Sequence, residues 1–251
     1  MIVNKIDKLS NILEKLNKGN ITPELRNEAL ELVKNINPLE LSIAEQKLID
    51  KGMKPEDLRH LCDIHMEVLK DELEKLKLKI DEGHVLETLI SEHDSILEFL
   101  TELDRLNLKV QEMTNYSKDR EEFKKLRQLS INILDAEKHH QREEEVLFLE
   151  MEDREITGPT RIMRMEHDNL RERKNLLKEI SHNVENMDFE EFKIKLDEVS
   201  KYIVFNLRDH IFKENYILYP TALESIEKVD TWDEMKNRCD EIGYCSFTPN
   251  K

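Results

Sequence analysis

Histidine and glutamate recur at four places beyond the first third of the chain, in the order His, His-xxx-Glu, His, His-xxx-Glu. Imidazole nitrogens and carboxylate oxygens are both accepted as ligands by first-row transition metals, so the pattern indicates a metal site. The candidate ligands are His93, His139 or His140, Glu143 or Glu144, His167, His210 and Glu214.

A single histidine near an apolar helix face is more often a hydrogen-bonded core residue than a ligand, so each position alone carries little weight. The whole set is stronger evidence for a metal site, because its members are expected at the same position along the axis of an antiparallel helix bundle. Counted from the expected helix ends at about 1.5 Å per residue, the histidine positions differ in height by about one helical turn or less. Four imidazoles and two carboxylates at one level predict a shared cation.

Helical periodicity, interrupted by short polar breaks, predicts the elements that carry these residues. The sequence has only 5 Gly, 6 Pro and 6% aromatic residues, which suits long helices around an aliphatic core. Long helices joined by short loops imply an all-α fold, an up-down antiparallel four-helix bundle. The long helices are expected over residues 85–113, 119–152, 159–186 and 188–228, with a last short helix over 231–242.

The same periodicity directs the candidate ligands toward the core. Leu86 and Leu89 share a helix face with His93, and Leu207 shares one with His210. A buried His-xxx-Glu pair is costly unless a cation compensates its charge. Six protein ligands suit two metal ions with open positions, as in di-iron or di-manganese bundles, better than a structural zinc ion.

The chain is expected to have three regions. The pattern of residues 1–82 predicts a domain of short helices. It ends at the segment Asp81-Glu82-Gly83, which is expected to terminate the last of these helices. Residues 83–230 are expected to form the metal-binding bundle, and residues 231–251 a C-terminal helix and tail. Within the first region, Cys62 and His65 share a helix face, which we interpret as a half-buried surface rather than an auxiliary metal pair.

Charge and composition argue against several kinds of partner. The formal net charge is −16 and no basic stripe is present, which argues against nucleic acid and anionic membranes. No apolar stretch reaches membrane-spanning length, and the N-terminus lacks the layout of a signal peptide. The 3 scattered cysteines suit free thiols in a reducing compartment. We therefore expect a cytoplasmic protein.

The four motifs resemble the hemerythrin-like (HHE cation-binding) family. They read EHDSILEFL at 92–100, HHQREEEVLF at 139–148, MEHDNLRE at 165–172 and DHIFKENYILYP at 209–220. The resemblance implies a non-haem di-iron centre, in which two iron ions are bridged by the glutamates and by an oxo or hydroxo group. The ligands it implies are His93, His139, Glu143, His167, His210 and Glu214.

One choice within the second motif is left open. On an ideal helical wheel, His140 and Glu144 lie nearer the apolar stripe of Ile133 and Leu147. The family pattern instead selects the pair one residue earlier, His139 and Glu143, which makes His140 and Glu144 supporting or surface residues.

By pattern, the chain is similar to the di-iron proteins that repair iron centres. Oxygen-carrying hemerythrins place two histidines four residues apart on the third helix, whereas the positions four before and after His167 are Met163 and Arg171. This favours reactions with nitric oxide, dioxygen or peroxide, in iron-centre repair or in protection from nitrosative and oxidative stress. A redox or iron-acceptor protein is a possible partner. The alternatives are a reversible dioxygen carrier or sensor and an iron storage or donor protein, so enzymatic activity is left open.

Four expectations concern other segments and the surroundings of the site. The N-terminal segment 36–65 and the C-terminal stretch 239–249 resemble a helical domain of unknown function that precedes hemerythrin domains. His84 is expected to serve at the boundary of the first long helix. Glu166 is expected to be a helix-surface acid, with a proton or metal relay as the alternative. Among the tyrosines, Tyr202 or Tyr216 is the candidate to reach a metal-bound ligand.

Overall fold

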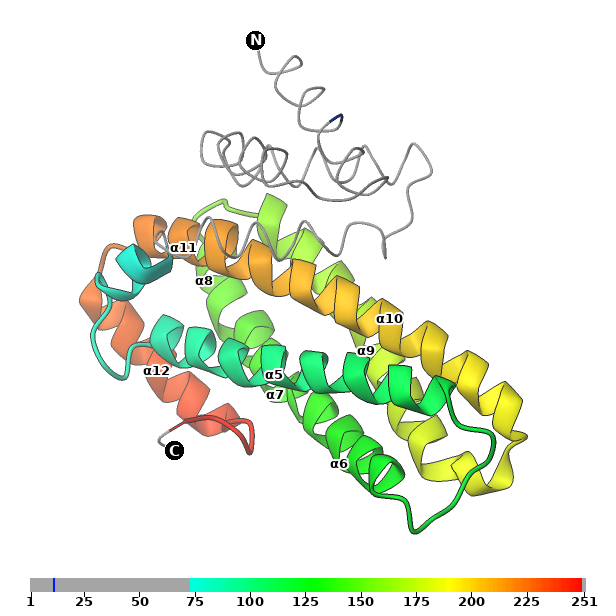
Figure 1. Ribbon diagram of the computed structural model, residues 1–251. Helices are drawn as coiled ribbons and strands as arrows, with labels where there is room; N and C mark the ends of the chain where they lie inside the picture. Colours follow the sequence, from blue (N-terminus) through cyan, green and yellow to red (C-terminus); the bar gives the residue numbers. More distant parts are fainter. Residues whose placement is uncertain (1–10, 12–72, 250–251) are drawn as a thin grey trace. The chain divides into compact units, whose positions relative to one another are not determined.

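The computed structural model describes Asn11 and residues 73–249, and this part of the chain contains helices and turns but no strand (Figure 1). The predicted all-α fold is confirmed. The helices expected before residue 73, together with Cys62 and His65, lie outside the described residues. The chain divides into two compact units: one comprises Met1–Lys79 and Phe212–Ile217, and the other comprises Ile80–Ile211 and Leu218–Lys251, which include most of the helix bundle.

The first long helix of the bundle, α5, spans Val85–Gln111. His84 caps its N-terminus, because Nδ1 of this histidine accepts a hydrogen bond of 3.1 Å from the backbone N–H of Leu86. The expected boundary role of His84 is therefore confirmed. The helix places Glu92 and His93 on its buried side, in the same row as Leu89.

The second long segment is interrupted, although the periodicity predicts one helix over 119–152. It consists of α6 (Glu121–Asp135), α7 (Glu137–Arg142), the π-helical turn η2 (Glu143–Leu147) and α8 (Phe148–Glu152). A single residue, Ala136, separates α6 from α7. Each irregularity rotates the residues that follow it relative to those before it, which matters for the choice between His139 and His140.

The third and fourth long segments agree with the expected ranges within a few residues. Helix α9 spans Gly158–Asn183, begins with a proline in its first turn and continues into the short 3₁₀ turn η3 (Val184–Asn186). The fourth segment consists of α10 (Phe189–Lys213), the π-helical turn η4 (Glu214–Leu218) and α11 (Tyr219–Ser225).

The four segments run side by side as a bundle (Figure 1). Helix α6 packs against both α5 and α9. Between α5 and α10, the side-chain amide of Asn107 donates a hydrogen bond of 2.9 Å to Asp197, and Gln111 donates one of 3.0 Å to the carbonyl of Lys193. The core is aliphatic with a few phenylalanines and includes Leu100, Leu103, Leu106, Phe123, Leu126, Ile133, Leu177, Phe192, Leu196 and Ile203.

A last helix, α12 (Val229–Ile242), packs on α5, α7 and η2. It ends at Gly243, whose φ of 86° is a conformation that glycine adopts without steric cost. The residues that follow return to the bundle near Glu92. None of the helices in the described part of the chain is long and apolar enough to cross a lipid bilayer.

Candidate metal centre

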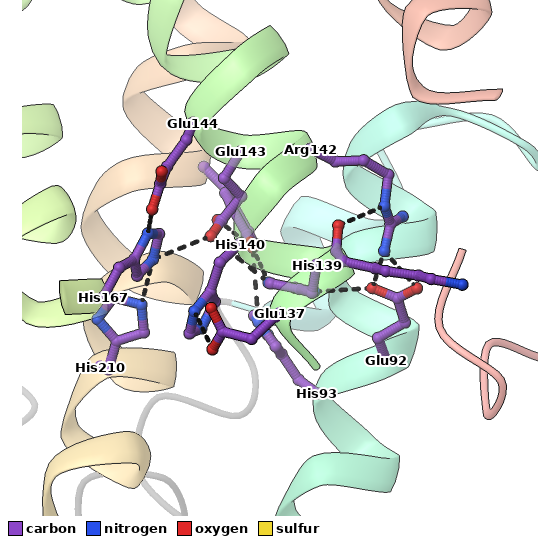
Figure 2. A network of polar contacts seen from close by, with 12 residues as sticks. Glu92, His93, Glu137, His139, His140, Arg142, Glu143, Glu144, His167 and His210 are labelled. Atoms are coloured by element: carbon purple, nitrogen blue, oxygen red, sulfur yellow. Dashed lines mark hydrogen bonds and ion pairs between the residues drawn. The ribbon is translucent and has the colours of Figure 1, made fainter. Parts of the chain in front are cut away.

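The candidate ligands converge in the interior of the bundle, and Figure 2 labels all of them except Glu214. Each of the six side chains is at most 1% exposed, and so is that of His140. So many buried imidazoles and carboxylates are costly unless hydrogen bonds or a cation compensate them. Within residues 73–249, three groups of donor atoms lie within 4.8 Å of one another: His140, His167 and His210; Glu143, His167, His210 and Glu214; His93, His139 and Glu214.

One pair of imidazoles comes from α9 and α10 and meets through its Nε2 atoms. The Nε2 atoms of His167 and His210 lie 2.9 Å apart. Nδ1 of His167 contacts Glu144 at 2.7 Å, and Nδ1 of His210 contacts Glu166 at 2.8 Å. If both Nδ1–H groups donate to these carboxylates, the lone pairs of the two Nε2 atoms point toward the same space. A bound cation would turn this repulsion into attraction.

Glu166 therefore has a defined contact in the bundle, and the expectation of a helix-surface acid is wrong. Its side chain is 21% exposed, so one part reaches solvent while one oxygen holds His210. The residue faces inward because it precedes His167 on α9 and points toward the neighbouring α10. The sequence carries a signal for this role, since Glu92 precedes His93 in the same way.

A second pair of imidazoles comes from α5 and α7. The ring centroids of His93 and His139 lie 4.9 Å apart. Nδ1 of His139 contacts Glu92 at 2.7 Å, and a guanidinium nitrogen of Arg142 donates to both oxygens of Glu92 at 2.6 Å. Sequence reasoning missed Glu92 and Arg142 as parts of the site.

The electrostatics of Glu92 follow from these contacts. Burial alone would raise the pKa of Glu92, but the hydrogen bond and charge of His139 and the charge of Arg142 outweigh burial and lower the pKa to about 2. The carboxylate therefore stays ionised and accepts the Nδ1 proton of His139. This fixes the tautomer that leaves Nε2 of His139 free to bind a metal.

Glu143 lies between the two pairs of imidazoles. One of its oxygens, Oε1, accepts a hydrogen bond of 2.9 Å from the hydroxyl of Tyr219. The other, Oε2, lies 3.4 Å from Nε2 of His167 and 3.7 Å from Nε2 of His139, and it has no hydrogen-bond partner among the described residues. A buried carboxylate oxygen in this position fits a metal-bridging ligand, because an ion near either imidazole would satisfy it.

Glu214 belongs to two of the three groups of donor atoms, one around His167 and His210 and one around His93 and His139. It is the first residue of η4, as Glu143 is the first residue of η2. Both His-xxx-Glu pairs thus enter a π-helical turn at the glutamate. Such turns are rare and often occur at functional sites, where they redirect side chains within a helix.

His140 is buried as completely as His139, so a surface position is excluded. Its ring lies parallel to that of His167, with centroids 3.9 Å apart and an interplanar angle of 4°. Lone pairs in two parallel planes do not converge on one ion, so this stacking argues against His140 and His167 sharing a metal in the arrangement seen. Its Nδ1 lies 3.4 Å from Glu137 and makes no hydrogen bond to any described residue. Burial, and then the charges of His167 and Lys174, lower the pKa of His140 well below its usual value.

The helix irregularities explain why an ideal wheel and the family pattern select different histidines in this segment. The break at Ala136 lies between Ile133 and His140, and the π turn lies between His140 and Leu147. A shift of one residue rotates the following side chains by about 100° on the wheel. Apolar residues on either side therefore do not define one stripe through the HHQREE segment.

Aromatic side chains enclose the imidazoles. The tyrosine beside the candidate ligands is Tyr219, rather than Tyr202 or Tyr216: its hydroxyl lies 3.5 Å from Nε2 of His93 and 3.4 Å from Nε2 of His139. The ring of Tyr202 instead packs under the guanidinium of Arg173. Phe148 stacks on His167 with centroids 5.7 Å apart.

Comparison with known families agrees with this geometry. A family of unknown function (DUF438) matches residues 9–75, and the hemerythrin HHE cation-binding domain matches residues 84–222. No curated protein matches the chain. The second match covers more than half of the sequence and includes all six candidate ligands, so the chain belongs to the hemerythrin HHE cation-binding family.

Proposed function

We propose that the bundle holds a non-haem di-iron centre that reacts with small molecules. The observation that carries the proposal is the position of Glu143 Oε2 between Nε2 of His139 and Nε2 of His167, without a hydrogen-bond donor among the described residues. A carboxylate that faces two imidazole-lined positions suits a bridge between two ions. With a single ion, the imidazole of either His139 or His167 would have no metal ion to bind.

The proposed ligands divide into two sets. His93 and His139 would hold one ion, His167 and His210 would hold the other, and Glu143 and Glu214 would be shared between them. The donor groups around Glu214 support this division, because this carboxylate has imidazole nitrogens of both sets within 4.8 Å. Imidazole and carboxylate ligands with no thiolate among the donors suit iron or manganese. Two imidazoles and two shared carboxylates leave each ion with open positions for an exogenous ligand.

When bound, such a centre supplies electrons to, or accepts them from, dioxygen, peroxide or nitric oxide. The chain contributes orientation and charge: Glu92, Glu144 and Glu166 each hold the Nδ1 proton of an imidazole, and Tyr219 holds a proton toward Glu143. The apolar core around them limits access of water. Protection or repair of iron centres is the role that we favour.

A reversible dioxygen carrier is the rival function. Oxygen carriers of this family have a second histidine four residues from the one on the third helix. Here Met163 is buried at one such position and Arg171 pairs with Glu137 and Glu144 at the other. Neither residue adds an imidazole to the ions, which supports redox turnover over simple storage of dioxygen.

Anaerobic reconstitution with ferrous iron, followed by metal analysis, tests the di-iron proposal. We expect two iron ions per chain; saturation at one ion or none would contradict it. Stopped-flow mixing of the loaded protein with dioxygen, peroxide and nitric oxide then separates the functions. Multiple turnovers with peroxide or nitric oxide are expected, whereas a stable, reversible dioxygen adduct would support the carrier instead.

A further inference from the structure

The two halves of the centre are built alike but supported differently. In each half, a glutamate lies directly before the first histidine of the pair and contacts Nδ1 of the second histidine. Glu92, before His93, contacts His139, and Glu166, before His167, contacts His210. The side chain of Glu92 is 0% exposed, whereas that of Glu166 is 21% exposed. The Glu92 carboxylate is therefore covered by a part of the chain that does not cover Glu166.

The cover over Glu92 is the C-terminal segment Tyr244–Thr248. The hydroxyl of Thr248 donates a hydrogen bond to Oε1 of Glu92. Sγ of Cys245 lies 3.8 Å from the Arg142 nitrogen that binds Glu92, and the Tyr244 ring lies 4.7 Å from the Arg142 guanidinium carbon. The Glu92 carboxylate is thus shared by three donors, His139, Arg142 and Thr248.

The segment is anchored along its whole length, so its contacts with Glu92 are not those of a loose end. The backbone N–H of Ser246 donates to Asp135, and Phe247 packs edge-on against Phe99 with centroids 5.1 Å apart. The ammonium of Lys138 donates a hydrogen bond of 3.0 Å to the carbonyl of Tyr244. These contacts join the segment to α5, α6 and α7, the elements that surround the His93–His139 half.

We propose that Thr248 is a positioning residue for the metal ligand His139, which it reaches through Glu92. This inference rests on the proposed di-iron function. Each hydrogen bond that a carboxylate accepts stabilises its charged form and lowers its basicity, so it pulls less strongly on every other proton that it accepts. Thr248 therefore weakens the pull of Glu92 on the Nδ1 proton of His139, which makes His139 a less electron-rich ligand. The C-terminal segment thereby sets the reduction potential of one half of the centre and makes the two ions inequivalent.

Substitution of Thr248 tests this proposal. Thr248→Val keeps the shape and removes the donor, and Thr248→Ser keeps the donor. Thr101→Val is the control, because it removes a hydroxyl on α5 that donates to the carbonyl of Leu97 and accepts from Arg208 but makes no contact with Glu92. In the reconstituted protein, Thr248→Val is expected to shift the reduction potential to more negative values, because an electron-rich imidazole favours the oxidised metal. Thr248→Ser and Thr101→Val are expected to keep the wild-type potential.

A second readout needs no metal. In the metal-free protein, a nitrogen-proton correlation spectrum of the histidine side chains is expected to show His139 as the Nδ1–H tautomer. Thr248→Val should move this resonance, and Thr248→Ser should leave it in place. A wild-type spectrum and potential for Thr248→Val, together with shifts for Glu92→Gln, would overturn the proposal. A wild-type protein that fails to bind two iron ions would instead contradict the di-iron function and leave the spectrum as the deciding test.

Discussion

His167 and His210 face each other through Nε2 atoms 2.9 Å apart, while their Nδ1 atoms contact Glu144 and Glu166. When both Nδ1–H groups donate to these carboxylates, the lone pairs of the two Nε2 atoms repel each other unless a cation binds between them. Metal binding should therefore stabilise the folded chain. At a free ion concentration about 100 times the dissociation constant, the gain is about 2.7 kcal/mol.

Calorimetry of the iron-loaded and the chelator-treated protein measures this stabilisation. We expect a higher melting temperature for the loaded protein, and return of the lower value after addition of a chelator. Equal melting temperatures in both states would mean that the imidazoles do not bind iron in the folded protein.

Single alanine substitutions decide between His139 and His140. His139→Ala should lower the iron content to about one ion per chain or less, because Nε2 of His139 faces Glu143 and Tyr219. His140→Ala should retain both ions, since its ring stacks on His167 instead of pointing at the same ion. Metal analysis after gel filtration measures both. Loss of iron in His140→Ala with retention in His139→Ala would reverse the assignment.

Alanine substitutions of Glu92 and Glu166 should lower the free energy of unfolding by different amounts. Glu92→Ala leaves Arg142 buried without its carboxylate, which should lower the free energy of unfolding by about 3–5 kcal/mol. Glu166→Ala removes a partly exposed carboxylate and should cost about 1 kcal/mol or less. Urea unfolding of the two metal-free variants measures the difference. Equal losses would show that the Glu92–Arg142 pair contributes no more than a surface contact.

Tyr219→Phe removes the hydroxyl that donates to Glu143 Oε1. Residues that orient metal ligands typically change metal affinity by about 10–100-fold when they are removed. We expect weaker iron binding of this order with an intact fold, measured by competition with a chelator of known affinity. Tyr202→Phe is the matched control, because the Tyr202 ring packs against Arg173 and should leave the affinity unchanged.

Two thiols near the C-terminus should be slow to react. Burial raises the pKa of Cys239 to about 11 and that of Cys245 to about 12. Because the thiolate is the nucleophile, alkylation of the folded protein at neutral pH should be slow at both. The rate should rise about tenfold for each pH unit until the pKa is approached. Peptide mass spectrometry after timed labelling with iodoacetamide measures this at each cysteine. Labelling of the folded chain as fast as of the urea-unfolded chain would contradict the burial.

Much of the fold follows from local pattern. Leucines at helical spacing predict where the long helices run, because each helix buries the face on which those residues recur. The short breaks between helices predict their antiparallel order. The order of the histidine motifs, with their heights along the helices, predicts that His93, His139, His167 and His210 meet. These are properties of residues close together in the sequence, so periodicity captures them.

Other parts of the site depend on packing that periodicity does not describe. The break at Ala136 and the π turn from Glu143 rotate His139 and His140 away from their ideal positions, so a wheel could not choose between them. The partners of the imidazoles come from neighbouring helices: Glu92 on α5 for His139 on α7, and Glu166 on α9 for His210 on α10.

The sequence by itself determined the fold class, the family resemblance and the set of residues that could bind metal. Only the tertiary structure decided how these residues are supported, and the clearest example is Thr248, which contacts Glu92 from 156 positions further along the chain. A hydrogen bond of this kind has no periodic signal. It forms because the chain turns at Gly243 and α12 packs on α5, which brings the C-terminal segment to the buried carboxylate of Glu92.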